Sequence, residues 1–285
     1  MLGRRGALGF LAVPPYLWLG LLFLVPLGSV LAISLLPQSG RIDFGSGWPS
    51  DTQYRQVLET SAYLRQLGTS ALMAFAVAGA ATVLAYPVAY FLAFRARERA
   101  AVFLILLLVP FATSFLLRVM AWKLLLGREG ALNWFLTSVG LVDEPSGLLI
   151  YSQAAVVITL TYIWIPFAAL PIYAALQRVD RSHLEAAADL GAGPWTRFAR
   201  VTLPLSLPGA LATFFMVFIP TVGEYVTPSL VGGTNGIMYG NLIQDFFSRA
   251  GNWPLGSALA VVMLVTTVLL VAFALRVVNV RRLTP

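Results

Sequence analysis

Residue types that carry acid–base, nucleophilic or metal chemistry are scarce in this chain of 285 residues. The single histidine, His183, has no histidine, cysteine or paired carboxylate neighbour at the spacing of metal ligands. Cysteine is absent, which excludes disulfides, thiolate metal sites and cysteine nucleophiles. The only lysine, Lys123, lies between tryptophan and leucine, whereas a phosphate-binding loop requires Gly-Lys-Ser or Gly-Lys-Thr. We therefore predict no catalytic residue, metal or cofactor, and any ATP hydrolysis by that route must occur in another chain.

Glu224 is the one acidic residue inside an apolar stretch of the sequence. An ionisable group within a bilayer costs roughly 2.5–3.5 kcal/mol on insertion scales, so such a group is a functional candidate. Its carboxylate and the ring of Tyr225 could together attract an ammonium group that crosses the membrane. The alternative is that Glu224 pairs with Arg118 or Lys123, or lies near the membrane interface.

Arg118 and Lys123 indicate a different kind of solute. Positive charges along a pathway repel a cation and suit an anionic solute such as a phosphonate. Alternatively, both side chains extend to the outer surface of the membrane. Arg118 and its neighbour Trp122 therefore join Glu224 and Tyr225 as the candidate residues of a substrate path.

The composition indicates that these residues are held by membrane-spanning helices. Only 11% of the residues are charged and 59% are hydrophobic, against roughly 25% and 45–50% in an ordinary soluble domain. A spanning helix needs about 20 mainly apolar residues. We therefore predict an all-α integral membrane protein whose single domain (1–285) has six spans, over residues 10–36, 67–94, 101–117, 151–176, 207–226 and 254–278.

Basic residues divide unevenly between the two sets of loops that six spans create. One set holds twelve arginines: Arg4, Arg5, Arg95, Arg97, Arg99, Arg178, Arg181, Arg197, Arg200, Arg276, Arg281 and Arg282. The other set has fewer basic residues and carries most of the acidic ones, including Asp43, Asp143 and Asp245. Cytoplasmic loops carry the excess of basic residues, so both termini are predicted to be cytoplasmic. This rule explains the net charge of +7, and no nucleic-acid partner is expected.

The longest cytoplasmic loop, residues 178–206, is punctuated like two short helices joined by a turn. Asp180 or Ser182 can cap the first helix, and Gly191 can supply a left-handed C-terminal stop. Pro194 suits the first position of a second helix. That helix has one apolar side, made by Trp195, Phe198 and Val201, and we expect it to end at Pro204, with Ser206 and Pro208 starting the fifth span.

The same loop resembles the EAA motif of type I importer permeases in ATP-binding-cassette transporters. The spacing matches residue by residue, and only Val201 departs, where isoleucine is usual. The positions of the motif in this sequence are Glu185, Ala186, Ala187, Gly191, Val201, Leu203 and Pro204. By resemblance, this loop carries the coupling helix that transmits closure of a cytoplasmic ATPase to the membrane helices.

The small side chains of Ala186 and Ala187, with Leu190, fit this implied role. They form a helix surface that can enter a groove on a partner, while Glu185 can pair with a basic group at the rim of that groove. The alternative, which is compatible, is that Glu185 pairs with Arg181 one turn away on the same helix.

Other segments are similar to permeases of the spermidine/putrescine type. These are residues 14–27, 108–122, 162–176, 223–233 and 252–264. The resemblance implies a permease subunit in a bacterial cytoplasmic (inner) membrane. It also implies the partners: two cytoplasmic ATPase subunits, a second, distinct permease subunit, and an extracytoplasmic solute-binding protein. The expected solute is a polyamine, with an aminophosphonate as the alternative.

Two other classes of function fit the sequence less well. A membrane-embedded hydrolase or transferase needs paired acids, or a nucleophile with a base. The predicted spans hold one carboxylate and no histidine or cysteine, which disfavours such an enzyme. A secondary transporter or channel fits the composition better, but it would leave the coupling loop unexplained.

Overall fold

The computed structural model describes residues 4–37, 42–45, 47–142, 144 and 149–278, and this part of the chain is helical, with no strand. It contains five helices that are long and apolar enough to cross a membrane, or six if a bent pair counts as one span. The prediction of an all-α membrane fold is confirmed. Asp143, Arg281 and Arg282, on which the loop-charge argument drew, lie outside the described residues.

The chain divides into two compact units, residues 1–65 with 242–266 and residues 66–241 with 267–285. In the first unit, helix α1 (Arg4–Ser34) is followed by the short helix α2 (Thr52–Glu59). The hydroxyls of Ser34 and Tyr54 are 2.6 Å apart, and Gln53 Nε2 donates to the carbonyl of Leu36 at 3.3 Å. These bonds tie α2 to the end of α1.

The same unit contains the end of α11 (Tyr239–Ser248) and the beginning of α12 (Trp253–Val278). The rings of Phe247 and Trp253 lie 5.6 Å apart, edge to face, across the turn between the two helices. Phe246 makes a similar contact with Tyr63, at 6.1 Å. Aromatic contacts therefore hold this corner together.

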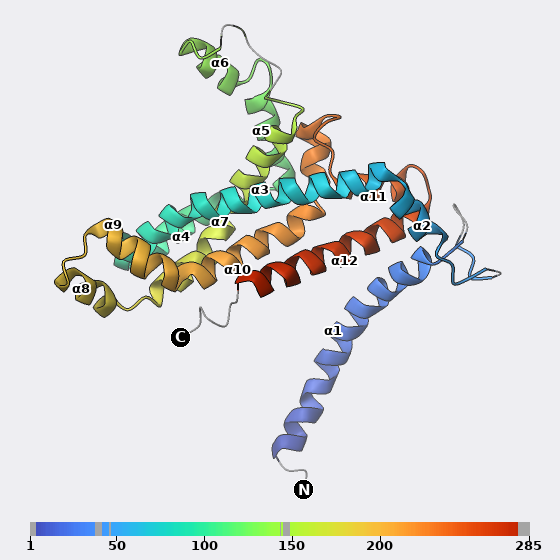
Figure 1. Cartoon of the computed structure of the whole chain (residues 1–285), viewed down its shortest axis with the longest axis horizontal. Coiled ribbons are helices and arrows are strands. Elements are labelled where there is room, and N and C mark those ends of the chain that lie inside the picture. The colour runs from blue at the N-terminus through green and yellow to red at the C-terminus, as the bar shows by residue number, and fades with distance from the viewer. Residues whose placement is uncertain (1–3, 38–41, 46, 143, 145–148, 279–285) are drawn as a thin grey trace. The chain divides into compact units, whose positions relative to one another are not determined.

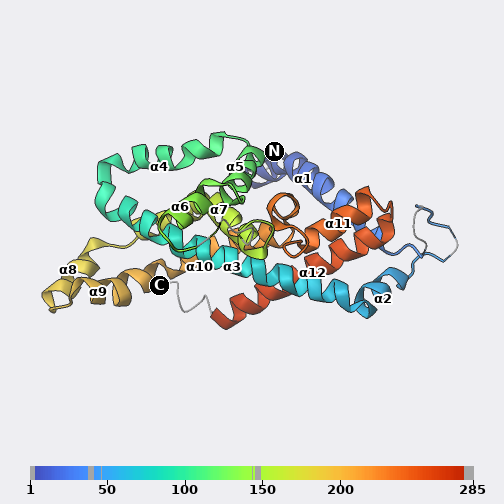
Figure 2. The ribbon, with the colours of Figure 1, turned by 90° about the horizontal axis from the view of Figure 1, so that it is seen from above.

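The second unit is built around α3 (Ser61–Phe91), α7 (Gln153–Gln177) and α10 (Leu203–Val222). Small residues let α7 and α10 approach closely: a Cβ atom on Gly209 would lie 2.3 Å from Cβ of Ala175. Thr213 Oγ1, on α10, also donates to the carbonyl of Ala168, on α7, at 3.3 Å. Figures 1 and 2 show these two helices side by side.

Alanines on α3 form a further close-packed seam. Ala74, Ala78, Ala81, Ala85 and Ala89 recur every three or four residues and are fully buried. Beyond Phe91 the helix continues as a π-helical turn, η1 (Leu92–Ala96), and a short 3-10 turn, η2 (Arg97–Arg99). The helix thus extends past the predicted end at residue 94.

The third predicted span, residues 101–117, is not one straight helix. It consists of α4 (Ala100–Leu108), the 3-10 turn η3 (Val109–Ala112) and the separate helix α5 (Phe115–Leu126), followed by α6 (Ala131–Ser138). The two halves meet at an angle of 84°. Pro110 breaks the helical hydrogen bonding, and Ser114 takes an extended backbone (φ −56°, ψ 138°) from which α5 starts.

The expected end of the second loop helix at Pro204 is also wrong. Helix α9 (Pro194–Arg197) continues through a π-helical turn, η4 (Phe198–Thr202), directly into α10. Pro204 lies at the start of α10, and proline has no backbone N–H that would need a hydrogen-bond partner. The N–H of Leu203 donates to the carbonyl of Phe198, five residues earlier, within the wider π-helical turn. Ser206 does not cap a new helix, because its hydroxyl bonds to the carbonyl of Thr202 at 2.8 Å.

The fifth predicted span, residues 207–226, ends earlier than expected, at Val222. Gly223 ends α10, and the chain then forms a short π-helical segment, η5 (Pro228–Gly232), before α11. The other predicted spans overlap α1, α3, α7 and α12, with ends that differ by up to several residues.

Candidate functional site

The coupling loop contains helix α8 (Arg181–Asp189), which is closed at both ends by local hydrogen bonds. The Asp180 carboxylate accepts from the backbone N–H of Ser182 at 3.0 Å, so Asp180 rather than Ser182 is the cap. This hydrogen bond lowers the pKa of Asp180.

The C-terminal end of α8 is a Schellman motif. Gly191 has φ of +81°, its N–H donates to the carbonyl of Ala188 at 2.8 Å, and the N–H of Ala192 donates to that of Ala187 at 2.9 Å. The predicted left-handed stop at Gly191 is confirmed, as is the restart of the helix at Pro194.

Aromatic contacts fasten the start of the α9–η4–α10 rod to α3. The rings of Trp195 and Phe198 stack at 5.4 Å, and Phe198 meets Tyr86 and Tyr90 edge to face at 5.8 and 5.9 Å. Tyr86 Oη also lies 2.6 Å from Ser206 Oγ. Because the Ser206 hydroxyl proton points to a helix carbonyl, Tyr86 is the donor in this pair.

This link between α3 and α10 was not predicted from the sequence. The two residues are 120 positions apart, and the local pattern around Ser206 suggested a helix cap instead. A hydroxyl inside an apolar stretch was the only available signal, and it does not identify its partner.

The coupling loop is exposed in the isolated chain and carries two large apolar side chains on its surface. No residue of α8 is buried, and Leu190 and Trp195 retain 89% and 77% of their accessible surface. Beside them is a hollow of about 460 Å³ with two arginines on its wall; its lining is Ala187, Leu190, Gly191, Ala192, Gly193, Thr196, Arg197, Arg200 and Val201.

Glu185 and Ala186 on α8 are exposed. Leu203 and Pro204, at the start of α10, are exposed as well. Within the described residues, no ion pair forms between Glu185 and Arg181. In this conformation, Glu185 is therefore available to a group from outside the chain.

The carboxylate of Glu224 lies on the turn between α10 and η5. Its Oε1 atom accepts from the backbone N–H groups of Val226 and Thr227 at 3.0 and 3.1 Å, so it caps the segment that follows. Tyr225, beside it, is 44% exposed. In the described part of the chain, Glu224 forms no ion pair with Arg118 or Lys123, the alternative that the sequence left open.

Arg118 is on α5, close to the break in the third span, and is 91% buried, its exposed fraction being 9%. Its guanidinium carbon is 4.1 Å from the centre of the Phe111 ring, which favours a cation–π interaction. It also lines a cavity of about 220 Å³ together with Tyr162 of α7. The ring of Trp122 contacts that of Tyr162 at 5.3 Å, so Arg118 and Trp122 share one neighbour.

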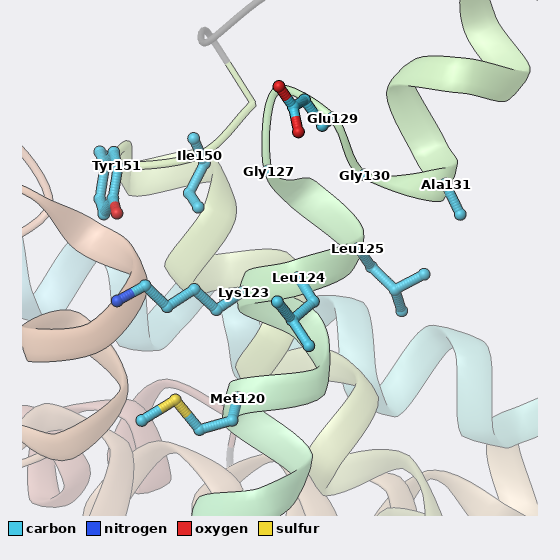
Figure 3. A pocket seen from close by; sticks show the side chains of 10 residues that line it. All are labelled: Met120, Lys123, Leu124, Leu125, Gly127, Glu129, Gly130, Ala131, Ile150 and Tyr151. Carbon is cyan, nitrogen blue, oxygen red and sulfur yellow. The ribbon is translucent and has the colours of Figure 1, made fainter.

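Lys123 lies five residues beyond Arg118 on α5 and lines a different, open hollow of about 700 Å³ (Figure 3). Its Nζ atom is 5.9 Å from the centre of the Tyr151 ring. Tyr151 has φ of +59°, which is unusual for a residue with a side chain. Gly233 packs closely against it, because a Cβ atom added to Gly233 would lie 2.6 Å from the Cβ atom of Tyr151. Glu129 also lines this hollow.

The predicted path residues therefore fall into two places in the structure. Glu224 and Tyr225 occupy the turn after α10, while Arg118 and Trp122 lie along α5 beside α7. The α5 helix packs against η5, which follows the Glu224 turn, so the two places belong to neighbouring elements.

Long apolar helices, a span broken at proline and an exposed two-helix loop together define the class of a multi-pass membrane permease. The chain belongs to the family of binding-protein-dependent transport system inner membrane components, whose model matches residues 81–285. Members of this family are transport permeases of the inner membrane.

Sequence relatives cover most of the chain. It is 33% identical over 254 residues to the spermidine/putrescine transport system permease protein PotB of Haemophilus influenzae, which covers 89% of this chain and 88% of that protein. It is 36% identical over 201 residues to PotB of Escherichia coli strain K12, covering 70% and 73%.

A solved structure shares the fold. A chain of a bacterial ABC transporter that imports the acidic polysaccharide alginate aligns over 99% of this chain and 98% of its own length. The TM-score is 0.69 and the sequence identity is 17%. The expected fold of an importer permease is confirmed, and the family membership decides against a secondary transporter or free-standing channel.

Proposed function

We propose that this permease subunit forms part of the translocation path of a spermidine/putrescine importer. The observation that carries the proposal is the similarity to the two PotB proteins, at 33% and 36% identity over most of the chain. The position of Glu224 supports a cationic solute. Only one carboxylate oxygen is used by the cap, and the other has no hydrogen bond to the described residues.

Glu224 and Tyr225 would act together on a polyamine. The carboxylate offers a negative charge, and the half-exposed Tyr225 ring offers a face on which an alkylammonium group can rest. A polyamine carries several ammonium groups separated by methylene segments, so one group can be exchanged for the next along such a path.

The coupling loop supports a partnership with two ATPase subunits. The exposed Ala186 and Leu190, with the partly exposed Ala187, would enter a groove on one ATPase, and Glu185 would meet a basic group there. Gly191 fixes the turn, while Val201, Leu203 and Pro204 belong to the continuous rod that leads into the membrane. Movement of the loop would then move α10 directly.

The remaining partners of the proposed importer are a second, distinct permease subunit and an extracytoplasmic solute-binding protein. In this assembly both termini, together with α8 and α9, face the cytoplasm, as the arginine distribution indicates. The segments around α2, α6 and η5 would face outward and meet the binding protein.

An aminophosphonate is the second candidate solute. Arg118 and Lys123 on α5 favour it, because they could bind the phosphonate while Glu224 binds the amine. Under this alternative the path would include Arg118 and Trp122.

The deciding experiment is ATP hydrolysis by the complete complex in lipid vesicles, with the solute-binding protein, in the presence of spermidine, putrescine or 2-aminoethylphosphonate. Stimulation by either polyamine would support the proposal. Stimulation by the phosphonate alone would overturn the polyamine assignment while leaving the permease class intact. A Glu185→Ala variant provides a control, because it should reduce stimulation by every solute equally.

A further inference from the structure

The guanidinium of Arg118 lacks a counter-charge in the described part of the chain. Its Nε atom is buried without a hydrogen-bond partner, and no ion pair there includes this residue. The ring of Phe111, at 4.1 Å, offers only a quadrupole. A buried charge in a membrane protein is normally paired, so a compensating group is missing.

Backbone groups around the cavity cannot replace a counter-charge. Pro110 and Pro166 line it, and because proline has no N–H, the carbonyls of Leu106 and Tyr162 lose their usual helical donors. Leu106 and Tyr162 themselves also line the cavity. Carbonyl dipoles could accept hydrogen bonds from Arg118, but they carry no net charge and leave the site positive.

The cavity borders a bare apolar face. Leu106, which lines it, is 59% exposed, and Ile105 and Leu117 on the adjoining turns of α4 and α5 are 64% and 65% exposed. In the assembled transporter this face must be covered by lipid or by protein. Lipid tails cannot neutralise a guanidinium, and the cationic solute of the proposed function would repel it.

We propose that this cavity receives a carboxylate side chain from the second membrane subunit, which forms an ion pair with Arg118 when the two permeases assemble. The choice of a protein carboxylate rests on the proposed function, since a polyamine cannot supply the negative charge. Assembly of the two permeases would then cover the apolar α4 face and neutralise Arg118 in one step. Both effects would favour the assembled state.

The test compares the stability of the solitary subunit with that of the complex. In Arg118→Met the side chain keeps much of its length but loses its charge. We expect the solitary subunit in detergent to melt at a higher temperature than wild type, because an uncompensated buried charge has been removed. The amount of second permease that co-purifies should instead fall about tenfold or more, because its carboxylate is left unpaired. A purely structural role would lower both quantities.

Charge reversal identifies the partner residue. Arg118→Glu should prevent co-purification, and one Asp→Arg or Glu→Arg change within the spans of the second permease should restore it. The control is Arg55→Met, which removes an exposed guanidinium from the outer segment and should change neither quantity.

The inference would be overturned by unchanged co-purification in Arg118→Met, by loss of stability in the solitary Arg118→Met subunit, or by no rescue of Arg118→Glu by any reversed acid. If vesicles of phosphatidylglycerol stabilise the solitary wild-type subunit as much as the second permease does, a lipid phosphate is the occupant and the proposal is also wrong. None of these readouts requires a transported solute, so the solute assignment can fail independently.

Discussion

Gly191 and Gly193 lie two residues apart in the coupling loop but have different backbones. Gly191 has φ of +81° whereas Gly193 has φ of −66°, and an added Cβ atom would meet no other atom within 4 Å at either position. Any difference between their alanine variants therefore reports backbone conformation. The left-handed region costs a residue with a side chain about 1–2 kcal/mol.

We expect Gly191→Ala to disturb the turn between α8 and α9, so that solute-stimulated ATP hydrolysis drops several-fold while insertion into the membrane is retained. Gly193→Ala should have a much smaller effect. The measurement is stimulated ATPase activity relative to the amount of assembled complex. Equal activity in both variants would mean that the Schellman turn does not govern coupling.

Glu224 can act as a helix cap, as a charge in the path, or as both, and two substitutions separate these roles. Glu224→Gln keeps an acceptor oxygen for the N–H groups of Val226 and Thr227 but removes the charge. If the charge attracts the solute, the spermidine concentration for half-maximal uptake should rise about tenfold, corresponding to about 1.4 kcal/mol. Glu224→Ala should be worse, since the cap is lost as well. Wild-type uptake by the glutamine variant would leave Glu224 only its capping role.

At the scale of elements, the contact between α3 and the α9–η4–α10 rod offers a matched pair of tyrosines. Tyr86 and Tyr90 make nearly the same edge contact with Phe198, but within the described residues only the Tyr86 hydroxyl has a hydrogen-bond partner, Ser206. Tyr86→Phe should therefore cost about 0.5–1.5 kcal/mol, the usual worth of such a bond.

We expect Tyr86→Phe to lower the thermal midpoint of the purified complex, and Tyr90→Phe to leave it nearly unchanged. Scanning fluorimetry in detergent provides the measurement. A result in which the two variants shift the midpoint equally would show that the rings, and not the hydroxyl, hold α3 to the rod.

Elements whose signals are local could be predicted from the sequence. The cap at Asp180 or Ser182, the turn at Gly191 and the restart at Pro194 each depend on neighbours within a few positions, and the structure has all three, with Asp180 as the cap. The break at Ser114 was missed because apolar composition continues across it, and hydropathy does not report backbone direction. The role of Ser206 was misread for the opposite reason: its partner is distant in sequence, and a proline after a serine is locally typical of a cap.

At the scale of the whole molecule, the predicted orientation can be tested because the chain has no cysteine. Single cysteines can be introduced at Ser182, on α8, and at Ser138, on α6, without any background of native thiols. In intact cells with a permeabilised outer membrane, a charged maleimide should label Ser138→Cys and fail to label Ser182→Cys until the inner membrane is opened. The reverse pattern would place both termini outside the cytoplasm.

The π-helical turn at Phe198–Thr202 sets the angle at which α8 projects around the axis of α10. Such a turn contains one residue more than the α-helical turn it replaces, and each residue of an α-helix rotates the chain by about 100°. Deleting one residue there would restore ordinary α-helix and swing α8 about the axis of α10 by roughly that angle. In the proposed importer, the direction in which the loop meets an ATPase subunit would therefore depend on this one additional residue, and related permeases could reorient the same contact by gaining or losing it.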